Sequence, residues 1–121
     1  MNPNFFDPLF ASDLAREVRS EFESLLLYGI PPAEAAGAVF EQFGGILSDP
    51  DEGPVVFVAV AALQWREGDL QAVVRDAALE LIAGGEALAA WGKRLTDVDT
   101  AARQRLLEDL ANALKAAKVS E

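Results

Sequence analysis

Apolar residues recur at helical spacing along most of the chain, and glycine or proline interrupts the pattern at intervals. Between Ser12 and Gly29 they fall every three or four residues, the spacing that places side chains on one face of an α-helix. Ser12 is a favourable N-cap and Gly29 a favourable stop, so the pattern predicts a helix over 13–28. Its apolar stripe consists of Leu14, Val18, Phe22, Leu25 and Leu26.

A second helix is predicted to begin at Pro31–Pro32, because proline is tolerated in the first helical turn, and to end at Gly44–Gly45. The segment 46–53 then combines turn-forming residues with three carboxylates, which is typical of an exposed acidic loop. The apolar stripe of this second helix consists of Ala35, Ala36, Val39, Phe40 and Phe43.

The segment 54–66 is strongly apolar and allows two interpretations. Its β-branched run, Val55–Val60, has the propensity of a buried strand. We favour a helix, because Pro54 suits a first helical turn, the apolar run continues beyond strand length, and Gly68 supplies a stop. A helix that is apolar on nearly every side is expected to be the central, most buried one.

The remaining chain predicts further helices. Asp69 is a candidate N-cap for a helix over 70–83, which Gly84–Gly85 closes, and a short helix over 86–91 is predicted to end at Gly92.

A last helix is predicted to start after Thr96 or Asp99 and to run to about Lys118. The total is about five helices plus a short one, so the fold class is an all-α bundle or an irregular helical array. We expect a single domain made of an N-terminal arm, an acidic helical core and a C-terminal helix, at residues 1–11, 12–92 and 93–121.

Missing residue types remove several chemistries from this 121-residue chain. It has no cysteine and no histidine, which excludes thiolate nucleophiles and removes the usual general base and zinc ligand. We therefore expect a protein that is not an enzyme and holds no cofactor or metal. A carboxylate enzyme that uses a divalent cation is the remaining catalytic alternative, although the acidic run Asp49–Glu52 lacks the ligand spacing of a calcium loop.

The net charge of −10 is unevenly distributed along the chain. Ser20–Trp65 contains seven carboxylates and no lysine or arginine, and residues 20–92 carry the whole excess. Such a region is either a solubilising surface or a docking face for a basic partner protein, whereas nucleic acid and anionic membranes are disfavoured as ligands. The candidate partner-binding residues are Glu34, Glu41, Asp49, Asp51 and Glu52.

Aromatic residues precede the first helix, and they have two possible uses. Phe5, Phe6 and Phe10 are expected either to dock on the bundle with Leu9 or to pair two chains in a homodimer. No export signal or membrane-length apolar segment is recognised, so a cytoplasmic protein is expected.

The string Gln64–Leu70 predicts a structural hinge between two helices. Trp65 can cover the core at a helix end, Gly68 can adopt a left-handed turn, and Asp69 can start the next helix. The hinge residues are Gln64, Trp65, Gly68 and Asp69, with Trp91 expected to pack near them.

This string, with the motifs after it, resembles a family of small acidic bacterial proteins that are mostly uncharacterised or regarded as immunity proteins of toxin systems. The shared pattern is Ala-x-x-Gln-Trp-x-x-Gly-x-Leu, then Ala-Leu-Glu-x-Ile, Gly and Trp, over residues 53–92. The resemblance implies a helical cytosolic protein without known catalytic residues. We expect a non-enzymatic module, similar to an immunity protein or antitoxin, that covers a basic partner such as a toxin; the alternative is a structural or regulatory homodimer.

Overall fold

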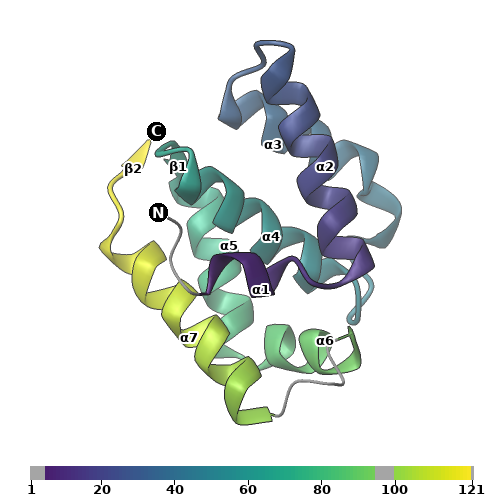
Figure 1. Cartoon of the computed structure of the whole chain (residues 1–121), viewed down its shortest axis with the longest axis vertical. Helices are drawn as coiled ribbons and strands as arrows, with labels where there is room; N and C mark the ends of the chain where they lie inside the picture. Colours follow the sequence, from purple (N-terminus) through teal and green to yellow (C-terminus); the bar gives the residue numbers. More distant parts are fainter. Residues whose placement is uncertain (1–4, 95–99, 121) are drawn as a thin grey trace.

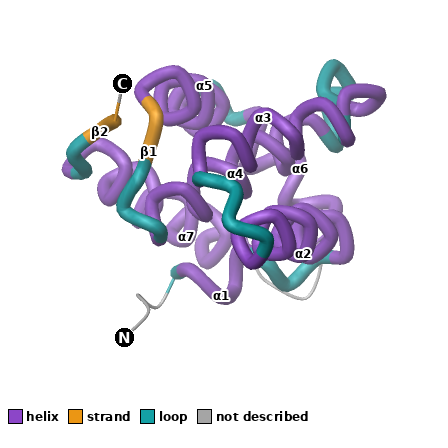
Figure 2. Tube along the Cα trace, turned by 90° about the horizontal axis from the view of Figure 1, so that it is seen from above, coloured by secondary structure: helices purple, strands orange, loops and turns teal. Residues whose placement is uncertain are grey.

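Helix α4 (Gly53–Arg66) is the central element of the structure, which is a computed structural model that describes residues 5–94 and 100–120. Every residue of α4 from Gly53 to Gln64 is buried except Phe57. Both Figure 1 and Figure 2 place α2 and α5 on opposite sides of α4, and α3, α6 and α7 also contact it. The prediction of a helix here is confirmed: an element surrounded by helices needs an apolar surface all round.

The two helices on either side of the turn at Gly29 are those that the sequence predicts. Helix α2 (Asp13–Leu27) is capped by Ser12, whose hydroxyl oxygen accepts a hydrogen bond from the Ala15 N–H at 3.3 Å. It ends at Gly29, whose φ of 86° lies in the left-handed region. Helix α3 (Pro32–Gln42) begins in the proline pair, and a single 3-10 turn, η1 (Gly44–Ile46), follows it.

The N-terminal arm docks on the bundle, which decides between the two expectations for its aromatic residues. A short helix, α1 (Phe6–Leu9), was not predicted, and it lies across the bundle in Figure 1. Trp91 holds this arm, because its indole N–H donates to the Leu9 carbonyl at 3.3 Å. Since the rings of Phe5, Phe6 and Phe10 are buried in the core of their own chain, they do not form an exposed surface for a second copy.

Two arginines contact the aromatic rings of the N-terminal arm. The Arg19 guanidinium carbon lies 5.4 Å from the ring centre of Phe6, and that of Arg66 lies 5.2 Å from the same ring. Both arginines also pair with Glu23, at 3.2 and 2.9 Å. These contacts join the arm, α2 and the end of α4 through cation–π and ionic interactions.

The chain after α4 departs from the prediction. Leu70 and Gln71 form a short strand, β1 (Leu70–Gln71), that pairs in parallel with β2 (Val119–Ser120). Helix α5 (Ala72–Ala83) therefore starts two residues later than predicted, and Asp69 is not its N-cap. The physical reason is that pairing with the distant C-terminal segment keeps Gln71 extended.

The last two helices also differ in their ends from the prediction. Helix α6 (Glu86–Arg94) continues through Gly92, so the predicted stop there is wrong. A β-carbon at Gly92 would lie 3.5 Å from the Arg103 side chain of α7 (Thr100–Ala116), so this glycine lies where the two helices pack together. The last helix ends at Ala116 rather than near Lys118, and the predicted caps Thr96 and Asp99 lie outside the described residues. The fold is all-α, as predicted, with seven α-helices in the described ranges against about six expected.

The predicted hinge is a turn fixed by both backbone and side chain. Gly68 has a φ of 74°, its N–H donates to the Trp65 carbonyl, and the Asp69 N–H donates to the Gln64 carbonyl, each at 3.1 Å. This is the hydrogen-bond pattern of a Schellman C-terminus. The Trp65 ring packs on Phe5 with 5.5 Å between ring centres, whereas Trp91 contacts the arm at Leu9, through the hydrogen bond to that carbonyl.

Gln64 is a fully buried polar residue with three hydrogen bonds. Its Nε2 donates to the Pro32 carbonyl at 3.3 Å and to Gln71 Oε1 at 2.8 Å, and its Oε1 accepts the Gln71 N–H at 3.1 Å. One amide therefore connects α4 to the start of α3 and to β1.

We expect Gln64→Leu to lower the free energy of unfolding by about 2–4 kcal/mol. The Pro32 carbonyl and the Gln71 N–H would both lose the hydrogen bond that Gln64 makes, and each buried polar group left without a partner costs about 1–3 kcal/mol. Chemical denaturation followed by circular dichroism measures the change. The matched control is Gln42→Leu at an exposed position of α3, where a change of at most about 0.5 kcal/mol is expected. Equal stabilities of the two variants would contradict the structural role of Gln64.

Candidate functional site

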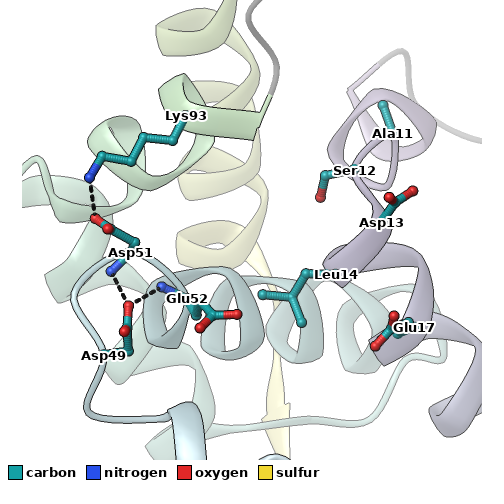
Figure 3. A pocket seen from close by; sticks show the side chains of 9 residues that line it. All are labelled: Ala11, Ser12, Asp13, Leu14, Glu17, Asp49, Asp51, Glu52 and Lys93. Atoms are coloured by element: carbon teal, nitrogen blue, oxygen red, sulfur yellow. Dashed lines mark hydrogen bonds and ion pairs between the residues drawn. The ribbon is translucent and has the colours of Figure 1, made fainter.

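An open hollow of about 760 Å³ lies between the start of α2, the loop before α4 and the end of α6. We call it the acidic hollow, because five carboxylates and one lysine line it. Figure 3 shows the loop residues on one side and the α2 residues on the other. The lining residues are Ala11, Ser12, Asp13, Leu14, Glu17, Asp49, Asp51, Glu52 and Lys93.

Asp49 shapes the loop side of the acidic hollow. Its Oδ1 accepts the N–H groups of Asp51 and Glu52 at 2.7 and 3.0 Å, and its backbone carbonyl accepts the Gly53 N–H at 2.8 Å. These three amides precede or begin α4, where no preceding helical turn supplies acceptors. Asp49 therefore acts mainly as a turn residue, and its carboxylate holds the other two acids in place.

The loop is less exposed than the sequence suggested. Asp49, Asp51 and Glu52 are all partly buried, and Gly53 is fully buried beneath the preceding turn. A β-carbon at Gly53 would overlap the Leu47 carbonyl oxygen, so no other side chain fits at this position without a shift of the backbone. The loop is partly buried because its backbone at Gly53 passes close to the backbone at Leu47. The presence of turn-forming residues in the sequence does not predict this contact.

The α2 side of the acidic hollow was not anticipated. Asp13 and Glu17 stand one helical turn apart, both are exposed, and both line the hollow. Asp13 also pairs with Arg16 on its own helix. The signal was present in the i, i+4 spacing of two acids at a predicted helix start, but the facing loop lies more than thirty residues away in the sequence.

Among the residues that the structure describes, Lys93 is the cation that lines the acidic hollow. Its Nζ lies 2.7 Å from Asp51 Oδ1, and both side chains are about half exposed. This ion pair joins the end of α6 to the loop before α4. Exposed pairs of this kind contribute about 0–1 kcal/mol, so the contact is exchangeable.

The other predicted acids lie elsewhere. Glu34 and Glu41 are exposed on α3 but do not line the acidic hollow. Glu23, in the same acidic window, is already paired with two arginines. The structure therefore brings Asp49, Asp51 and Glu52 together with α2 and not with α3.

The carboxylates of the acidic hollow are spread apart. Within residues 5–94 and 100–120, no group of three or more acidic side chains is close enough to hold a metal ion. The arrangement suits several positive charges delivered at separate points, rather than one small cation bound by all the ligands at once.

Comparison of the chain with protein-family models, curated protein sequences and solved structures found no match. In the described part of the chain, none of the helices has the length and apolar character needed to cross a bilayer.

We expect Gly53→Ala to lower the free energy of unfolding by about 1–3 kcal/mol, because the added methyl group would overlap the Leu47 carbonyl and force the loop away from α4. Thermal unfolding measures the effect. Gly45→Ala is the matched control, since a β-carbon there meets nothing within 4 Å and its φ is not positive. A Gly53→Ala protein as stable as the control would show that the loop does not need this close approach.

Proposed function

We propose that this chain is a non-enzymatic, cytoplasmic protein-binding module of the immunity or antitoxin kind, which covers a basic site on a partner protein such as a toxin. The observation that carries the proposal is the convergence of five carboxylates, from two segments distant in sequence, on one open hollow. A surface with this excess of one charge attracts a partner of the opposite charge and disfavours wrong partners.

The mechanism is occlusion by a complementary surface. Lysine or arginine side chains of the partner enter the acidic hollow and compete with Lys93 for Asp51. The Lys93–Asp51 pair is itself exposed and contributes little to stability. The partner loses access to its basic site for as long as the complex lasts.

The carboxylates chosen for a test exclude Asp49, since its substitution would alter the turn itself. We expect Glu17→Gln/Asp51→Asn/Glu52→Gln to weaken binding of a lysine-rich peptide about tenfold, because three ion pairs at the surface together contribute about 1–2 kcal/mol. Fluorescence anisotropy with labelled peptide measures the affinity. Raising the salt from about 50 to about 500 mM NaCl is expected to weaken binding by wild type at least as much.

The matched control removes the same number of charges elsewhere, with Asp76→Asn/Glu108→Gln/Asp109→Asn at exposed positions of α5 and α7. Its affinity is expected to stay within about twofold of wild type. An equal loss in both triple variants would mean that the peptide senses only net charge, and the acidic hollow would then not be the site.

A structural or regulatory homodimer is the second candidate function, and one observation favours it. Leu27 and Tyr28 are 88% and 83% exposed at the end of α2, and exposed large apolar groups are candidates for contacts between chains. The charge of −10 on each copy opposes self-association. We expect a monomer in light scattering at low and high salt; a dimer that Leu27→Ser/Tyr28→Ser abolishes would favour this second function.

A further inference from the structure

Phe57 is an exception in the most buried helix of the protein. The other residues of α4 between Gly53 and Gln64 are buried, yet this large aromatic side chain is partly exposed. Complete burial of a phenylalanine side chain contributes about 1.5–3 kcal/mol to the free energy of folding. Because Phe57 is only partly buried, it contributes less than this. The position therefore marks a surface where an apolar contact is incomplete.

Phe57 lies in a groove of about 360 Å³ formed by α4, α5 and the start of α6. The floor is apolar, with Ala77 and Leu81 of α5 beside the phenylalanine, and all three residues are partly exposed. The ring of Phe40 on α3 extends this apolar surface, because its centre lies 5.1 Å from that of Phe57. We call this site the α4–α5 groove.

The rim of the α4–α5 groove is acidic. Glu80 and Glu86 line it and are exposed, and none of the lining residues within the described part of the chain is a lysine or arginine. The Glu86 carboxylate lies close to the turn after α5, where a β-carbon at Gly84 would meet its Oε1.

We propose that the α4–α5 groove docks a cationic amphipathic segment of a partner protein. An apolar side chain of the segment covers Phe57 and Leu81, and lysine or arginine residues one helical turn away meet Glu80 and Glu86. Apolar contact supplies most of the affinity, and the acidic rim selects the charge of the segment. This surface shares no lining residue with the acidic hollow and does not depend on the function proposed for it.

Charge decides between this occupant and others. A second copy of the chain carries −10, so its approach to an acidic rim is repelled. Nucleic acid and anionic lipid are disfavoured for the same reason. An apolar segment without charge would leave the two carboxylates partly desolvated and unpaired, which is costly.

The test uses a short synthetic helical peptide with two leucines one turn apart and lysines flanking them, titrated into the full-length ¹⁵N-labelled protein. We expect chemical-shift changes to centre on Phe57, Ala77 and Leu81. A peptide with glutamate in place of lysine and one with serine in place of leucine are each expected to bind at least about tenfold more weakly. Equal binding of the leucine and serine peptides would overturn the proposal.

Variants locate the site without disturbing the core. Ala77→Gln fills the groove from an α5 position that tolerates a longer helix-forming side chain, and Glu80→Gln/Glu86→Gln removes the acidic rim. Each is expected to weaken the leucine–lysine peptide about fivefold or more. The charge-matched control Glu108→Gln/Asp109→Asn, at exposed positions of α7 outside both surfaces, is expected to leave this binding unchanged.

The outcomes separate the two proposals. Loss of peptide binding in the groove variants, with binding kept in the α7 control, supports the α4–α5 groove and says nothing about the acidic hollow. Binding that the groove variants leave unchanged, with shift changes at the acidic hollow instead, overturns this inference and leaves the proposed function intact. Unchanged binding in all variants, or shift changes spread over the whole surface, also overturns it.

Discussion

The amide of Gln64 is the directional constraint on which the arrangement of the helices depends. Hydrophobic burial holds α4 in the centre, but that interaction is non-directional, and a helix that is apolar all round could rotate without losing much of it. The hydrogen bonds that join Gln64 to Pro32 and Gln71 are directional, so they fix how α4 is rotated about its own axis and where it lies relative to α3 and β1. Both surfaces proposed for binding depend on this orientation, since Gly53 at one end of α4 positions the acidic loop and Phe57 faces the α4–α5 groove.

The parts of the fold that the sequence predicted are those with local causes. The capping of α2 by Ser12 and its stop at Gly29 need only neighbouring residues, and the length of the apolar run decided that α4 is a helix. The errors have distant causes. Residues near Leu70 became a strand because Val119 pairs with them, and Gly92 stayed helical where α6 packs against α7.

The candidate site was predicted in part for a similar reason. Counting charges along the chain identified the acidic loop, because its three carboxylates lie within four residues, Asp49–Glu52. Counting could not show that Arg19, from the nearly neutral N-terminal flank, cancels Glu23, or that Glu17 from the same flank faces the loop. Charge along a sequence is a sum, whereas charge on a surface depends on which helices lie side by side.

The turn built by Asp49 has a kinetic consequence for the binding proposed at the acidic hollow. Because its carboxylate already binds the amides of Asp51 and Glu52, the loop has its shape before any partner arrives, and no segment has to be ordered during the encounter. Association can then proceed at a rate set by diffusion and electrostatic attraction. Partners that share a basic surface would arrive at similar rates and differ mainly in how long they stay bound.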